Sequence, residues 1–247
     1  MKDESGLPPT ESTAKSGVPT LAKTLLYALL TTAAVTVLSY AVPDKYAATA
    51  VGLAFLGATY ALVLRGDEAL IRSYGLSLGG LLEPSPLSFR RLMREGGQAL
   101  LFALGLSLLI FPLFWYGYRT YWHVRGHFVF RLPGSPLDEI AGQFLVIALP
   151  EEAFFRGYLQ TSLDHAFPAK KKILGAELGL GWLISAVIFA VGHVLTTPHP
   201  ARLAVFFPAL AFGWLRARTG GIGAGTLFHA LCNLFSATLA RGYGLSP

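Results

Sequence analysis

Three ionisable residues lie close together in a stretch of sequence that is otherwise apolar. Glu151, Glu152 and Arg156 fall within Ala-Leu-Pro-Glu-Glu-Ala-Phe-Phe-Arg-Gly-Tyr, residues 148–158, inside a longer run with the composition of a membrane-spanning helix. An ionised side chain is costly in hydrocarbon, and those that occur there face the interior of a helical bundle or a water-filled cavity. The three residues therefore predict a functional site inside the membrane.

The spacing of these residues predicts that two of the three charges pair and that the third stays unpaired. Glu152 and Arg156 are four residues apart and share one face of a helix, whereas Glu151 is turned away by about 100°. We expect Glu152 and Arg156 to form a supporting ion pair, which leaves the Glu151 carboxylate as the candidate general base. Pro150 precedes them and, because it has no N–H, frees a backbone carbonyl and predicts a kink.

Two histidines and an asparagine occupy later apolar runs. His193 ends Phe-Ala-Val-Gly-His, residues 189–193, and His-Ala-Leu-Cys-Asn, residues 229–233, places His229 and Asn233 four apart on one helix face. Both side chains can donate hydrogen bonds, as stabilisation of an oxyanion during acyl transfer requires. His193 supplies a second imidazole that shares the proton of a water molecule with Glu151. These residues compose a scheme for peptide hydrolysis by activated water, without a nucleophilic side chain.

The same residues fit other functions. A zinc metalloprotease would take His193, His229 and a glutamate as ligands, although the chain has no His-Glu-x-x-His motif. A transporter would use the buried charges as a proton relay, and a non-catalytic immunity or binding protein would keep the polar core without turnover. Sensitivity to chelators distinguishes a metalloprotease, and ion flux distinguishes a transporter. Loss of activity on a single carboxylate change distinguishes an enzyme from a non-catalytic protein. Cys232 is expected to be a small, buried and inert residue.

The composition predicts a membrane protein built from helices. Hydrophobic residues form 53% of the 247 residues, charged residues form 14%, and the mean hydropathy is +0.52. Apolar runs of 18 or more residues recur, which predicts an all-α transmembrane bundle of about seven helices, seven to eight in all. The net charge of +6 falls in short segments between the runs, so membrane topology explains it without a nucleic-acid partner. The single cysteine excludes an internal disulfide.

The apolar runs define the expected crossings, and the basic residues orient them. The crossings are residues 21–42, 46–64, 98–118, 138–163, 177–197, 202–217 and 223–240. With the N-terminus inside, the inner segments hold Lys2, Lys15, Lys23, Arg65, Arg72, Arg90, Arg91, Arg94, Lys170, Lys171, Lys172, Arg216 and Arg218. The outer segments hold only Lys45, Arg119, Arg125, Arg131, Arg202 and Arg241. Because positive residues gather on the cytoplasmic side, this distribution predicts a cytoplasmic N-terminus.

We expect three parts along the chain: a polar tail at residues 1–20, N-terminal membrane helices at 21–134, and a catalytic core at 135–247. The longest connection, residues 65–97, is basic. Within it, Leu87, Phe89, Leu92 and Met93 alternate with arginines, which predicts a short amphipathic helix on the membrane surface.

Taken in order, the motifs resemble those of the CPBP (Abi) family of intramembrane glutamic endopeptidases, which includes the type II CAAX prenyl proteases. The resemblance rests on residues 151–156, 189–193 and 229–233 and covers roughly residues 138–240. It implies that Glu151 and His193 activate water, that Glu152 and Arg156 support them, and that His229 and Asn233 bind the oxyanion. It implies no cofactor, with zinc as the alternative.

The resemblance also implies a substrate class and a location. The expected substrate is a membrane-associated or lipidated peptide or protein, processed in a CAAX-type, bacteriocin-related or C-terminal anchor reaction. The partners expected are the lipid bilayer and this substrate. The compact chain without organelle signals predicts a multi-pass protein of a bacterial inner membrane.

Overall fold

The computed structural model describes residues 19–169 and 171–245, so the predicted tail at residues 1–20 lies almost wholly outside the described residues. The chain begins with α1 (Leu21–Ala41) and α2 (Asp44–Thr59), which continues as a π-helical turn, η1 (Tyr60–Leu64). Two short elements follow, α3 (Glu68–Ser73) and the 3-10 turn η2 (Leu78–Gly80), and then the long α4 (Phe89–Tyr121).

The second half of the chain supplies the centre of the bundle. One run of helix comprises α5 (Pro136–Ala141), η3 (Gly142–Ala148), α6 (Leu149–Glu152), η4 (Ala153–Gln160) and α7 (Thr161–Ala166), of which η3 and η4 are π-helical. A hairpin of β1 (Lys171–Ile173) and β2 (Ala176–Leu178) leads into α8 (Leu180–Thr196). The 3-10 segment η5 (Pro200–Val205), α9 (Phe206–Thr219) and α10 (Gly223–Tyr243) complete the chain.

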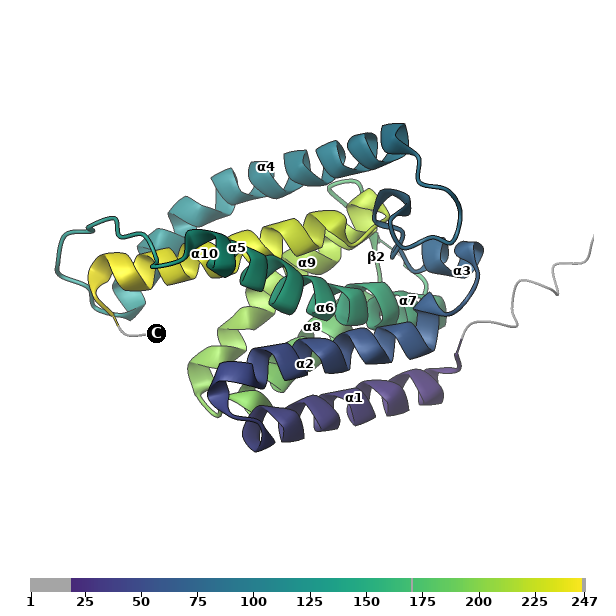
Figure 1. Ribbon diagram of the computed structural model, residues 1–247, viewed down its shortest axis with the longest axis horizontal. Helices are drawn as coiled ribbons and strands as arrows, with labels where there is room; N and C mark the ends of the chain where they lie inside the picture. The colour runs from purple at the N-terminus through teal and green to yellow at the C-terminus, as the bar shows by residue number, and fades with distance from the viewer. Residues whose placement is uncertain (1–18, 170, 246–247) are drawn as a thin grey trace, which may run out of the picture.

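These helices form the all-α bundle that the composition predicted (Figure 1). Three of them are long and apolar enough to cross a membrane: Leu21–Ala41, the α2–η1 run Asp44–Leu64, and Phe89–Tyr121. A fourth apolar helix, Leu180–Thr196, is shorter. The run from α5 to α7 covers the expected crossing at 138–163. The expected crossing at 202–217 begins in η5 and continues in α9, and α10 covers the one at 223–240.

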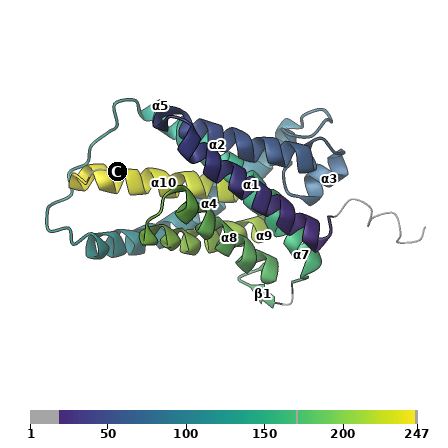
Figure 2. The same ribbon diagram turned by 90° about the horizontal axis from the view of Figure 1, so that it is seen from below.

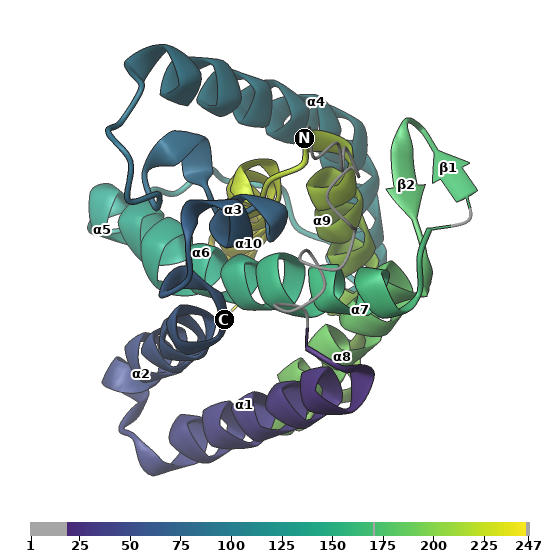
Figure 3. The ribbon, with the colours of Figure 1, turned by 90° about the vertical axis from the view of Figure 1, so that its right-hand side faces the viewer.

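The run from α5 to α7 lies between the other helices. In Figure 1, α4 lies along one side of the molecule and α1 along the opposite side, with α10 and the α5–α7 run between them. The same order is seen from the end in Figure 3, whereas in Figure 2, from below, α1 and α2 lie in front of the other helices. α2 packs on η3, α6 and η4, while α8 packs on η4, α9 and α1. Residues on α6 are therefore covered from several sides.

Pro150 and Gly52 set how closely α2 approaches this run. Because Pro150 has no N–H, the carbonyl of Val146 four residues earlier receives no α-helical hydrogen bond from it, and the preceding segment is π-helical. A Cβ atom at Gly52 would clash with the carbonyl oxygen of Val146. Glycine at this position lets α2 pack directly against the altered backbone just before Glu151.

The prediction of a separate surface helix around residues 87–94 is wrong. Ser88 caps α4, since its side chain accepts a hydrogen bond from the N–H of Arg91, and the helix then continues for 33 residues without a break. Gly96 and Gly97 lie within this helix, and a Cβ atom at either position would have nothing within 4 Å. At 1.5 Å per residue α4 is about 50 Å long, so it extends well beyond a hydrocarbon layer of about 30 Å.

The connection before α4 is folded against the bundle by an ionic cluster. The Glu83 side chain is 1% exposed and accepts hydrogen bonds from Arg72 at 2.8 and 2.9 Å and from Arg91 at 2.7 Å. These two guanidinium groups hold the pKa of the Glu83 carboxyl well below its usual range. Tyr74 and Leu76 of the same connection are buried in the core. The basic connection is therefore an ordered part of the fold.

The predicted start of the fifth crossing at residue 177 is also wrong, because Glu177 belongs to the hairpin. β1 and β2 pair antiparallel in the register Lys171 with Leu178 and Ile173 with Ala176. Leu174 and Gly175 between them have φ values of 48° and 82°, the geometry of a two-residue hairpin turn. α8 therefore begins at Leu180, and its 17 residues extend about 26 Å.

Candidate active site

The supporting ion pair predicted from the sequence is present and buried. The Nη1 atom of Arg156 lies 3.3 Å from Oε1 of Glu152, and the two side chains are 1% and 0% exposed. Arg156 also donates from Nη2 to the carbonyl of Ala209 at 3.2 Å. Its guanidinium lies over the rings of Phe189, at 4.4 Å, and Phe212, at 5.1 Å. A buried cation surrounded by a carboxylate, a carbonyl and two aromatic faces is held in one position.

The same carboxylate fixes the orientation of His229. Nδ1 of His229 lies 3.0 Å from Oε1 of Glu152, and because a carboxylate only accepts, Nδ1 carries the proton of this hydrogen bond. The imidazole stacks on Phe212 with ring centroids 4.6 Å apart. Its other nitrogen, Nε2, then points towards Glu151, whose Oε2 lies 3.9 Å away. Glu152 thus bridges Arg156 and His229, and the sequence analysis had predicted only the first of these contacts.

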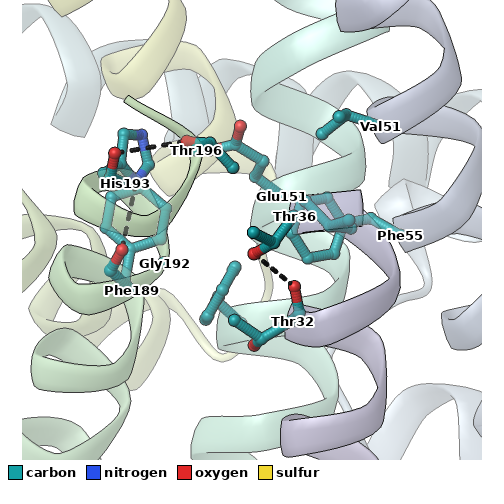
Figure 4. A pocket seen from close by; sticks show the side chains of 11 residues that line it. Thr32, Thr36, Val51, Phe55, Glu151, Phe189, Gly192, His193 and Thr196 are labelled. Carbon is teal, nitrogen blue, oxygen red and sulfur yellow. Dashed lines mark hydrogen bonds between the residues drawn. The ribbon is translucent and has the colours of Figure 1, made fainter. Parts of the chain in front are cut away.

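Glu151 and His193 line one small cavity (Figure 4). The cavity has a volume of about 50 Å³ and lies between α8, α6 and the N-terminal helices. Its lining comprises Thr32, Val35, Thr36, Val51, Phe55, Glu151, Phe155, Phe189, Gly192, His193 and Thr196. Within residues 19–169 and 171–245, the buried Oε2 atom of Glu151 has no hydrogen-bond partner. A free carboxylate oxygen beside an imidazole is the arrangement that water activation needs.

His193 reaches this position because α8 is short. It lies in the last turn of α8, and its Nδ1 donates to the carbonyl of Phe189 at 3.0 Å, since a carbonyl only accepts. The Nε2 atom is then left as an acceptor. α8 ends at Thr196 close to the level of Glu151, at the middle of the α5–α7 run, so a histidine at a helix end meets a carboxylate deep in the bundle.

Asn233 is placed differently from the other predicted site residues. It lies one turn after His229 on α10 and is partly buried, but it is not among the residues that line the cavity. Cys232 beside it is a partly buried free cysteine. The structure thus brings Glu151, Glu152, Arg156, His193 and His229 together, and the oxyanion role of Asn233 stays a prediction.

The N-terminal helices contribute residues to the cavity that the sequence analysis did not predict. Thr32 and Thr36 of α1 and Val51 and Phe55 of α2 face Glu151 and His193 across it (Figure 4). The only local signal was the pair of threonines four residues apart in an apolar run, and the Thr36 hydroxyl donates to the Thr32 carbonyl at 2.8 Å. A threonine that satisfies its own helix backbone is ordinary in a membrane helix, so this signal alone predicts no site.

A catalytic zinc centre needs three protein side chains that converge on one point. Within the part of the chain that the structure describes, no group of three His, Cys, Asp or Glu side chains is arranged to hold a metal ion. Hydrolysis without a metal ion stays a prediction.

One protein-family model matches part of the chain. The model of the family described as type II CAAX prenyl endopeptidase Rce1-like matches residues 133–235, which confirms the resemblance drawn from the three motifs. The matched segment runs from just before α5 to within α10 and contains all six candidate residues, whereas α1, α2 and α4 lie outside it. Searches of curated proteins and of solved structures found no match.

Proposed function

We propose that this chain, whose residues 133–235 match the Rce1-like type II CAAX prenyl endopeptidase family, is an intramembrane endopeptidase that hydrolyses a peptide bond of a lipidated, CAAX-type substrate. One observation carries the proposal. The side chains of Glu151 and His193 line one cavity, and within residues 19–169 and 171–245 the buried Oε2 atom of Glu151 has no hydrogen-bond partner, beside an ion pair that fixes the neighbouring groups.

In the proposed reaction Glu151 acts as the general base. A water molecule in the cavity gives a proton to the free Glu151 oxygen and is oriented by Nε2 of His193, whose other nitrogen is held by the Phe189 carbonyl. The resulting hydroxide attacks the carbonyl carbon of the substrate, and the protonated Glu151 then supplies a proton to the leaving amine. No side chain forms a covalent bond with the substrate.

The neighbouring groups support the charges that develop. Glu152 and Arg156 position His229, whose Nε2 faces Glu151. For His229 to donate a hydrogen bond to an oxyanion, Nε2 must carry a proton in addition to the one on Nδ1, so His229 is proposed to act as an imidazolium between Glu151 and Glu152. Asn233, one turn along α10, is proposed to donate the second hydrogen bond to the oxyanion when substrate is bound.

The proposal is tested with the full chain in proteoliposomes and a farnesylated, quenched-fluorescence peptide that ends in Cys-Xaa-Xaa-Xaa. Glu151→Gln should lower the cleavage rate by about 10²- to 10⁴-fold, the usual contribution of a positioned general base. Its melting temperature should stay near that of the wild type, because within residues 19–169 and 171–245 the Glu151 Oε2 atom has no hydrogen bond to lose. Glu177→Gln, on the exposed hairpin, is the matched control and should retain full activity.

Two results would refute this assignment. If the wild type cleaves no lipidated peptide, the proposed function is wrong. If Glu151→Gln keeps more than about a tenth of the wild-type rate, another group activates the water.

The proposal includes a location in the bacterial inner membrane with a cytoplasmic N-terminus. Its support is the excess of basic residues on one set of connections, including Arg72 and Arg91, which hold the connection before α4 in place. A reporter that is active only outside the cytoplasm, fused after α10, should be active, whereas the same reporter fused within the β1–β2 hairpin should be silent.

A further inference from the structure

We propose that the cavity beside Glu151 is a specificity subsite, which admits only a small side chain at the substrate residue directly after the scissile bond. The inference rests on the proposed function and adds to it a substrate class and the residues that select it. The selecting residues lie on α1, α2 and the end of α8, and those of α1 and α2 are outside the segment that matches the family.

Size is the first argument. The cavity measures about 50 Å³, about a third of the volume of an engineered cavity of about 150 Å³ that binds benzene. Glycine, alanine and serine side chains fit such a space, while those of leucine and phenylalanine do not. A prenyl chain is larger still, so the lipidated cysteine before the scissile bond stays outside. The cavity is therefore left for the residue on the other side of the bond.

The far wall of the cavity is apolar and rigid. Val35 and Phe55 are 4% and 5% exposed, and Phe55 packs against Phe154 and Phe155 with both pairs of ring centroids 5.4 Å apart. Phe154 and Phe155 follow Glu152 on the central helix run, so the wall is fixed to the same element as the catalytic carboxylate. Because these aromatic rings are closely packed, their displacement by a large substrate side chain would cost free energy.

Polar residues line the same cavity beside these apolar ones and can meet the peptide backbone of a substrate. The Thr32 hydroxyl oxygen and Oε2 of Glu151 are both buried, and neither has a hydrogen-bond partner within residues 19–169 and 171–245. Figure 4 shows Thr32 and Thr36 on one side and His193 on the other, with Glu151 between them. A substrate peptide group entering here would satisfy the Thr32 hydroxyl and place its small side chain against Val35 and Phe55.

Gly192 offers a substitution that reduces the cavity without a clash. A Cβ atom at Gly192 would have the Thr32 Cγ2 atom as its nearest neighbour at 3.8 Å, an ordinary van der Waals contact. Gly192→Ala therefore adds one methyl group to the lining of the cavity without strain. Gly57→Ala is the matched control, because Gly57 lies on α2 with nothing within 4 Å of its Cβ position. Val35→Ala enlarges the cavity from the opposite wall.

The experiment uses farnesylated Cys-Xaa-Xaa-Xaa peptides that carry Gly, Ala, Ser, Leu or Phe directly after the cysteine, with the full chain in proteoliposomes. The wild type should cleave the Gly, Ala and Ser peptides at least about tenfold faster than the Leu and Phe peptides, the discrimination that one or two methylene groups produce in an apolar pocket. Gly192→Ala should slow the Ala and Ser peptides relative to the Gly peptide. Val35→Ala should raise the rate for Leu relative to Ala, and Gly57→Ala should change none of these ratios.

The outcomes separate this inference from the function on which it rests. Equal wild-type rates across the series refute the subsite and leave the endopeptidase activity intact. The subsite is also refuted if Gly192→Ala lowers the cleavage rate equally for all five peptides while its melting temperature equals that of the Gly57→Ala control. Such an equal loss is a general effect on the site and not a change of specificity. Cleavage of no peptide by the wild type refutes the proposed function itself.

Discussion

Breaking the buried pair between Glu152 and Arg156 should destabilise the protein strongly. Both side chains are at most 1% exposed, and the loss of either partner leaves a charge without compensation at a cost of about 3–5 kcal/mol. For a chain of this size each kcal/mol corresponds to roughly 2–4 °C, so Arg156→Gln should lower the melting temperature by roughly 6–20 °C. Glu152→Gln should also be destabilising, although its amide oxygen can still accept the hydrogen bond from His229.

The double variant that combines Glu152→Gln with Arg156→Gln gives a sharper test of the pair than either single change. When both charges are removed, no unpaired ion remains, so the combined loss should be smaller than the sum of the two single losses by about 0.5–3 kcal/mol. Thermal unfolding in detergent measures all four proteins. The matched control is Arg241→Gln, which breaks a pair with Glu139 at 2.9 Å whose side chains are 29% and 18% exposed. A pair exposed to this extent contributes about 0–1 kcal/mol.

The reasoning would be refuted by either of two results. One is a melting temperature for Arg156→Gln no lower than that of Arg241→Gln. The other is strict additivity of the two single changes at Glu152 and Arg156, because independent sites do not form a pair.

Three further predictions test other parts of the structure. Gly52→Ala should lower the melting temperature because its Cβ would meet a backbone carbonyl of η3, whereas the Gly57→Ala control should not. Glu83→Gln should be less stable than the wild type at neutral pH, and the difference should shrink as the pH falls below about 4, the ordinary glutamate value, because a lowered pKa in the folded state stabilises only the ionised form; a difference that grows towards acid pH contradicts this. Cleavage should survive exhaustive phenanthroline or EDTA treatment, and zinc that is lost with activity and restores it on addition would instead show a metalloprotease.

The contacts that follow from local helix geometry were predictable. Four-residue spacing alone placed Arg156 beside Glu152, and the cost of buried charge alone placed both in the interior. The bond between Glu152 and His229 joins residues 77 positions apart, and no spacing rule predicts which of two carboxylates meets an imidazole on another helix.

The contribution of α1 and α2 was not predictable for a different reason. Val35 and Phe55 are ordinary apolar residues of apolar runs, and only the packing of whole helices brings them to the cavity. The boundary errors have local causes. The start of α4, which carries Arg90, Arg91 and Arg94, lacks the apolar composition of a crossing and was therefore predicted as a separate surface helix. Leu174, with a positive φ, closes a hairpin turn that usually takes Asn or Gly.

The π-helical turns on both sides of Glu151 and Glu152 have a consequence for sequence change. A π turn holds one residue more than an α turn, so a single deletion within η3 can be absorbed by conversion of that turn to α-helix. The same deletion in a regular helix would rotate everything beyond it by about 100°. The segments that flank the two glutamates can therefore vary in length by one residue while the carboxylates keep their orientation. A deletion between Leu149 and Glu152 has no π-helical turn that could absorb it.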